Sequence, residues 1–352
     1  MPNGHVESDA QDAGRRWWTP PARVRAFVAR HETPLWWLHS LYVLGLGALV
    51  MWLGARHYAW LRFSAFYLVF IWISSLFLAE VVNRRDGVWW SRARLAVNYV
   101  NKNCYQQLLF FILPIYAGST TFRSGNVIFI IVLGLSAVLS TLDIVYDRVL
   151  SVRRNLAAWF FAFNVFAVVN LALPVLFGVS NAYALRAAAV AAVVGFVTLA
   201  WRMSRLRRGT TWVWVAGGAL AVLLVAEAAR PFVPPAPLCL LATEFGSGID
   251  RRRFRVTGAM PSAPDAAGRR VFASTAVRAP LGLRDRVELR WYLDGRLLWA
   301  SSAHEVVGGR TDGFRLWSAV TLGPADTSGS LRLDVCTAAG QLIGRAAIEL
   351  HP

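Results

Sequence analysis

The most polar stretch beside a long apolar run in this sequence is NYVNKNCYQQ, residues 98–107. Its amides and its ammonium group are suited to binding a lipid headgroup or another anionic partner. If the stretch is helical, Asn103, Gln106 and Gln107 share one face. The predicted polar site at the inner leaflet of a membrane consists of Asn101, Lys102, Asn103, Gln106, Gln107, Asp143 and Tyr146.

The alternative role of these residues is structural. Amide side chains form hydrogen bonds between membrane helices, and Lys102 and Asp143 would form an ion pair that holds two helices together. We favour this role because the ionisable groups lie at the ends of apolar runs. A charged group in the middle of such a run would indicate function more strongly.

A second polar cluster lies closer to the C-terminus and contains Arg251, Arg252, Arg253 and Arg255. Guanidinium groups form bidentate contacts with carboxylates and phosphates. The cluster therefore suits a lipid phosphate, an acidic glycan or the carboxylates of a partner protein. An exposed loop beside a strand explains the same residues without a ligand, and we favour that explanation.

No enzyme signature accompanies these clusters. The six histidines are scattered, with no pair at metal-ligand spacing, and no nucleophile elbow or phosphate-binding loop is present. We therefore predict a non-enzymatic protein with no cofactor and no metal.

The three cysteines match no metal-binding or redox pattern. If Cys239 and Cys336 share an oxidising compartment, a disulfide between them would close about 100 residues and stabilise the fold by about 4–5 kcal/mol. Strand alternation argues against this bridge, because Cys336 points away from Leu333 and Val335.

The composition indicates a membrane protein. Hydrophobic residues make up 56% of the chain, above the roughly 45–50% of a soluble globular protein. The net charge of +17 would suit nucleic acid, but the cations cluster in alternate loops between apolar runs, so we predict no nucleic-acid binding.

The predicted architecture is an α-helical polytopic membrane bundle followed by a small all-β, immunoglobulin-like sandwich. A helix needs about 20 apolar residues to cross the hydrocarbon. Seven runs approach this length, and the third is the least certain because its N-terminal end is polar. The predicted spans are 35–55, 61–79, 103–121, 126–143, 155–177, 182–202 and 210–228.

Loop charges predict the orientation of these spans. One set of alternate loops is rich in arginine, whereas the opposite loops offer Arg56, Arg62, Arg123 and Arg186. By the positive-inside rule the N-terminus is cytoplasmic and the C-terminal domain lies outside the inner membrane. Residues 1–34 form a cytoplasmic basic arm, in which ARVRAFVAR is either an interfacial helix or a plain linker.

After a proline-rich linker, residues 229–237, the pattern changes to short strands over residues 238–352. In RVELRWYL, residues Val287, Leu289 and Trp291 alternate with polar positions, which predicts a half-buried strand. Asp294 and Gly295 then predict a tight hairpin turn. Trp291, Trp299 and Trp317 are predicted to be core or sheet-face residues, with a carbohydrate-binding platform as the alternative.

The sequences of these strands resemble those of a known bacterial family. Arg290-Trp291-Tyr292, the turn after it and Arg315-Leu316-Trp317-Ser318 resemble the C-terminal module of an uncharacterised bacterial multi-pass membrane family, a domain of unknown function of the DUF2914 type. Leu289 stands where that module usually has histidine, so any role of that histidine is absent here. The resemblance implies the architecture above and no established activity.

Together these patterns predict an inner-membrane scaffold or sensor whose exported β-domain binds a protein or glycan of the envelope, with membrane lipids as the other partner. The alternative function is a membrane-embedded enzyme or a lipid or solute carrier that uses the polar site at the inner leaflet.

Overall fold

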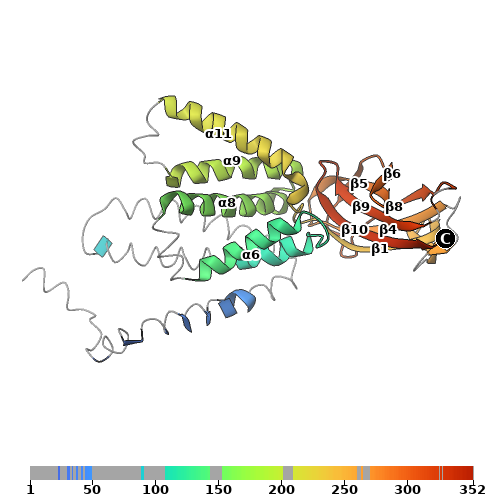
Figure 1. The fold of residues 1–352 in the computed structure, drawn as a ribbon, viewed down its shortest axis with the longest axis horizontal. Helices are drawn as coiled ribbons and strands as arrows, with labels where there is room; N and C mark the ends of the chain where they lie inside the picture. Colours follow the sequence, from blue (N-terminus) through green and yellow to red (C-terminus); the bar gives the residue numbers. More distant parts are fainter. Residues whose placement is uncertain are drawn as a thin grey trace, which may run out of the picture.

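The computed structural model describes residues 108–142, 153–200, 209–259, 263–264, 270–324, 326 and 328–351, residues 89–90 and scattered positions between 23 and 49. These residues form a group of helices and, at one end of that group, a β-domain (Figure 1). The predictions for Asn101, Lys102, Asn103, Gln106, Gln107, Asp143 and Tyr146 lie outside the described residues.

The helices are rich in alanine, valine, leucine and phenylalanine. Glycine ends the longest of them, because Gly178 adopts the left-handed conformation (φ 65°) that closes a helix. In chain order they are Leu108–Gly118, α6 (Val127–Thr141), α8 (Arg154–Phe177), α9 (Asn181–Ala200), α11 (Gly209–Ala228) and the short 3-10 helix η3 (Arg230–Phe232).

The prediction of a seven-helix membrane bundle is wrong. Within the described part of the chain, one helix, Asn155–Phe177, has the length and hydropathy needed to cross a membrane. The other apolar helices are shorter, namely Leu108–Gly118, Val127–Thr141, Asn181–Val197 and Trp212–Ala228.

The physical reason lies where the helical hydrogen bonds end. Between Gly118 and Val127 the chain forms a turn in which Asn126 Oδ1 accepts hydrogen bonds from Thr121 N (3.1 Å) and Ser124 Oγ (2.6 Å). This turn ends one helix at Gly118 and begins the next at Val127, so both helices are shorter at this turn than the expected spans 103–121 and 126–143.

The β-rich C-terminal region is confirmed. A four-stranded sheet has the order β2-β1-β4-β8, and a six-stranded sheet has the order β3-β10-β9-β5-β6, with β7 also paired to β5. The strands are β1 (Cys239–Asp250), β2 (Arg255–Ala259), β3 (Ala263–Pro264), β4 (Arg270–Arg278), β5 (Arg284–Leu293), β6 (Arg296–Ala300), β7 (His304–Val307), β8 (Phe314–Thr321), β9 (Gly329–Thr337) and β10 (Leu342–His351).

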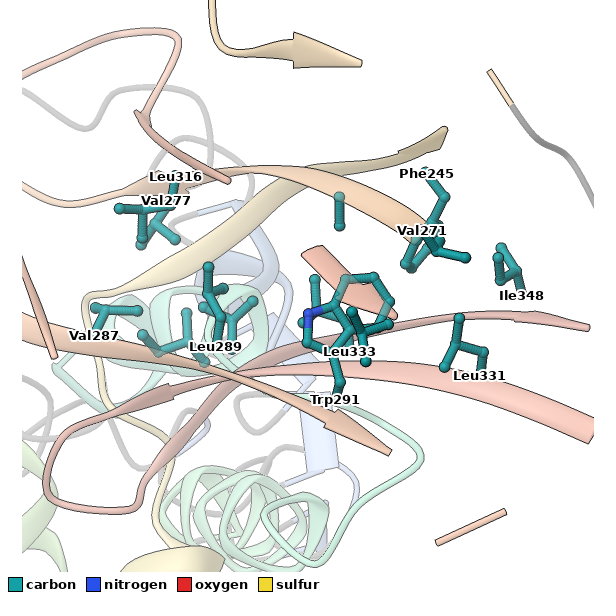
Figure 2. Packing of buried hydrophobic residues seen from close by; sticks show 14 of the residues in the cluster. Phe245, Val271, Val277, Val287, Leu289, Trp291, Leu316, Leu331, Leu333 and Ile348 are labelled. Carbon is teal, nitrogen blue, oxygen red and sulfur yellow. The ribbon is translucent and has the colours of Figure 1, made fainter. Parts of the chain in front are cut away.

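The core of the β-domain lies between the two sheets (Figure 2). The alternation predicted for β5 is confirmed, since Val287, Leu289 and Trp291 are fully buried. Trp291 Nε1 donates a hydrogen bond to Ser318 Oγ of the opposite sheet (2.9 Å), which satisfies the one polar atom of this buried ring. The predicted hairpin turn is also confirmed, with positive φ angles at Asp294 (46°) and Gly295 (85°).

The β-domain is docked directly onto the helix ends. At the start of α9, the backbone N–H and the side-chain amide of Asn181 both donate to Asp285 Oδ2 of β5 (3.0 and 2.9 Å). Asn126 donates to the carbonyl of Leu342, and Gln341 donates to the carbonyl of Val233. These donors are fully buried, so the contact excludes water and holds the β-domain in one orientation.

The closest approach within this junction is made by glycine. A Cβ added at Gly178 would overlap the backbone carbonyl of Gly282, the residue before Leu283 in the loop that leads to β5. Larger residues are therefore excluded at Gly178 by both the contact and the positive φ.

We expect Gly178→Val to loosen this docking and to raise amide hydrogen exchange at residues 281–285 by at least about tenfold, because the new side chain must push the β-domain away. The matched control is Gly295→Val, which also has a positive φ but no atom within 4 Å of the added Cβ. Exchange measured by mass spectrometry on the full chain should change only around β5 and β6 in the control. Unchanged exchange at 281–285 in Gly178→Val would contradict the docking account.

Candidate anion-binding groove

The candidate site lies on the outer face of the four-stranded sheet. The register aligns Glu244 of β1, Ser274 of β4 and Trp317 of β8 in one row across the sheet. The neighbouring row aligns Ala276 of β4 with Arg315 of β8. On β8 the side chains of Leu316 and Val320 belong to the core, so the alternate positions, Arg315 and Trp317, face outward.

The loop between β1 and β2 folds over this face. Asp250 Oδ1 accepts hydrogen bonds from the backbone N–H groups of Arg252 (2.9 Å) and Arg253 (3.3 Å), which closes the turn. Ser274 Oγ donates to the carbonyl of Phe254 (2.5 Å), and the guanidinium of Arg251 lies 5.4 Å from the ring centroid of Trp317. The loop is thus attached to the sheet before any ligand binds, which lowers the entropic cost of binding.

Beside the folded loop lies a groove of about 450 Å³, within the size range of small-ligand pockets. A second hollow of about 650 Å³ shares Thr311, Asp312 and Arg315 with it and continues along residues 309–315. The charged groups that line the two hollows are Glu244, Arg255, Arg278, Arg310, Asp312 and Arg315.

Three of these arginines, Arg255, Arg310 and Arg315, have no counter-ion in the described part of the chain, and Arg310 lies over the ring of Phe314. No described carboxylate lies within ion-pair distance of these three arginines. Arginine remains charged at any physiological pH. The face therefore carries positive charge that suits a carboxylate or a phosphate.

The six-stranded sheet offers a direct contrast on its own outer face. Asp334 accepts two hydrogen bonds from Arg345 (2.7 and 2.8 Å), and Glu288 accepts two from Arg290 (2.9 and 3.3 Å). Arg332 lies over the ring of Tyr292 at 4.4 Å. Most cations on that face are matched by neighbours, so an external anion would have to compete with them. The exception is exposed Arg286 of β5, which has no carboxylate within ion-pair distance among the described residues.

The structure brings part of the predicted arginine cluster into the site. All four arginines are exposed. Arg255 lines the groove and Arg251 lies over Trp317, whereas Arg252 and Arg253 are in the turn and do not line the groove. Arg315, Arg310 and Asp312 were missed as site residues. The alternation in Arg315-Leu316-Trp317 was the available signal, because it puts Arg315 and Trp317 on the same face of one strand.

The possible disulfide between Cys239 and Cys336, against which strand alternation argues, is not formed in the structure. Both thiols are free, and they belong to different sheets, since Cys239 pairs with Arg278 of β4 and Cys336 with Glu288 of β5. Burial raises the pKa of the Cys336 thiol to about 11 and also raises the pKa of Cys239. Among the described residues no group of three His, Cys, Asp or Glu side chains is placed to hold a metal ion.

Residues 17–264 match the model of a family described as "Family of unknown function (DUF5924)". The chain belongs to this family. The prediction of an uncharacterised family is confirmed, but the DUF2914 label is not. The match covers the helices and the first strands, including Arg251 and Arg255 of the site, and ends before Arg315.

A comparison with curated proteins gives no match. Among solved structures, an immunoglobulin-like protein from Pseudomonas aeruginosa is similar, with 15% sequence identity and a TM-score of 0.21. The similarity covers 32% of this chain and 96% of that protein.

Because the thiolate is the reactive form of cysteine, we expect Cys336 to resist alkylation by iodoacetamide. With a pKa of about 11, on the order of a thousandth of the thiol is ionised at pH 8. Labelling of the folded full chain, followed site by site by mass spectrometry, should be at least about a hundredfold slower than after denaturation. A labelling rate that levels off near pH 8.5 in the folded protein would contradict this burial.

Proposed function

We propose that this protein is a membrane-anchored, non-enzymatic binding protein of the cell envelope, whose β-domain captures an anionic partner in the groove of the four-stranded sheet. The observation that carries the proposal is the pair Arg255 and Arg315, which line a preorganised groove without a counter-ion among the described residues. A bound carboxylate or phosphate would supply the missing charge.

Exposed apolar side chains support the membrane anchor. Along α6 and α11 many large hydrophobic side chains face outward, including Ile131, Leu135, Leu220 and Leu224. An apolar surface of this kind is stable against lipid and is unfavourable in water. The described charges of the helical region lie near helix ends, where headgroups or water can solvate them, namely Arg123, Arg153, Arg154, Arg186, Glu227 and Arg230.

Aromatic residues support the same anchor. Trp159 near the start of α8 and Phe177 at its end are both exposed. The segment between them spans about 27 Å at 1.5 Å per residue, close to the ~30 Å hydrocarbon thickness of a bilayer. Exposed Trp212 and Trp214 lie at the start of α11, and exposed Tyr183 lies at the junction end. Tryptophan and tyrosine concentrate at the two interfaces of a membrane.

The orientation we propose exposes the β-domain outside the cytoplasm. Arg123 and Arg186, which belong to the cation-poor loops of the sequence, lie at the helix ends that meet the β-domain. Arg153 and Arg154 begin α8 at its other end. The positive-inside rule then favours a cytoplasmic location for the end of the helices farther from the β-domain.

The proposal predicts that Arg255→Ala combined with Arg315→Ala weakens anion binding by at least about tenfold, because two charge-assisted contacts are lost. The full chain would be reconstituted in phosphatidylcholine nanodiscs, whose headgroups carry no net charge. Binding of two probes, a glutamate-rich peptide and polygalacturonate, would be measured by fluorescence anisotropy.

The matched control is Arg284→Ala combined with Arg296→Ala. It removes the same charge from exposed positions on the six-stranded sheet. The control should bind both probes like the wild type. If neither probe binds the wild type, or if both double variants lose binding equally, the groove is not an anion-binding site.

A further inference from the structure

Strand β8 forms one edge of the four-stranded sheet. It pairs with β4 along its whole length, from Phe314 opposite Val277 to Thr321 opposite Arg270. On its other side no strand of the described residues is paired with it. In an edge strand every second residue directs its backbone N–H and C=O away from the sheet, so β8 presents an unused row of donors and acceptors.

The groove reaches this edge. Arg315 belongs both to β8 and to the lining of the two hollows, and Trp317 with Arg251 above it lies two residues further along the same strand. Arg310 and Asp312 lie in the segment that leads into β8. A ligand alongside β8 would therefore meet backbone groups and guanidinium groups at the same time.

We propose that an extended acidic segment of a partner protein pairs with β8 as an added strand and directs alternate carboxylates onto the arginines of the outer face. This inference rests on the proposed function and names its ligand. In strand addition the backbone hydrogen bonds supply affinity, and alternate side chains supply specificity. Side chains on one face of a strand recur about every 7 Å, so a carboxylate at every second position follows the face that carries Arg315 and Arg251.

Aromatic geometry favours a peptide over a glycan. Sugars bind to the open face of an aromatic ring, but the ring of Trp317 is covered by the guanidinium of Arg251 and Trp291 is buried in the core. Trp299 is exposed, but it belongs to β6 of the other sheet and does not line the groove. Free backbone groups along β8 are complementary to another backbone. Arg315 also disfavours pairing between the β8 strands of two copies of the protein, because the two guanidinium charges would repel each other.

The probe for this inference is an eight-residue peptide of alternating glutamate and threonine, capped at both ends, added to the full chain in phosphatidylcholine nanodiscs. Two further versions carry N-methyl groups on the backbone nitrogens of either all glutamates or all threonines. In a strand these two sets of N–H groups point to opposite edges. For a given direction of the peptide along β8, only one set can face that strand.

Strand addition predicts that one methylated peptide loses binding at least tenfold relative to the other, which stays within threefold of the unmodified peptide. If the two methylated peptides differ by less than threefold, strand addition in a single direction is excluded and the proposed pairing is wrong. If polygalacturonate binds in a manner sensitive to Arg255→Ala with Arg315→Ala while the peptide does not bind, the groove serves an acidic glycan. In that case the proposed function stands and the strand partner is wrong. If neither probe binds, both fail.

Discussion

The contact on which the rest of this structure depends is the docking of the β-domain onto the helix ends. Gly178 and Gly282 bring the two backbones together, and Asn181 secures the contact by donating twice to Asp285. Buried polar groups are costly unless they are satisfied, so these hydrogen bonds specify one arrangement. An orientation fixed in this way decides which surface of the sandwich the helices occupy and which surface stays open to a partner.

The two outer faces of the sandwich differ in how their arginine charges are paired. The six-stranded sheet carries several arginines whose charges are compensated internally, as with Arg345 on Asp334. The four-stranded sheet carries Arg255 and Arg315 without such partners among the described residues, under a loop already attached through Ser274. A site with unpaired charge and little conformational freedom loses less conformational entropy when it binds an anion than a flexible cluster of the same residues does.

Much of the β-domain could be predicted from the sequence because strand alternation and turn chemistry are local. The period of two around Trp291 and the Asp294-Gly295 turn identify β5 and its hairpin without tertiary information. The break between the expected spans 103–121 and 126–143 was predictable from composition. The exact helix ends at Gly118 and Val127 were not, since the turn around Asn126 depends on side-chain hydrogen bonds. Arg315 joins Arg255 only because the loop after Asp250 folds back over the sheet, and no spacing in the sequence encodes that fold-back.

The central claim, that the face carrying Arg255 and Arg315 is the binding face, is tested most directly by a hydrogen-exchange footprint. The full chain in phosphatidylcholine nanodiscs would be compared with and without the alternating glutamate–threonine peptide at saturation. We expect slowed exchange in residues 251–255 and 309–321, with no change in β9 and β10. Protection on β9 and β10 instead, or no protection of residues 309–321 by a peptide that binds, would contradict this claim.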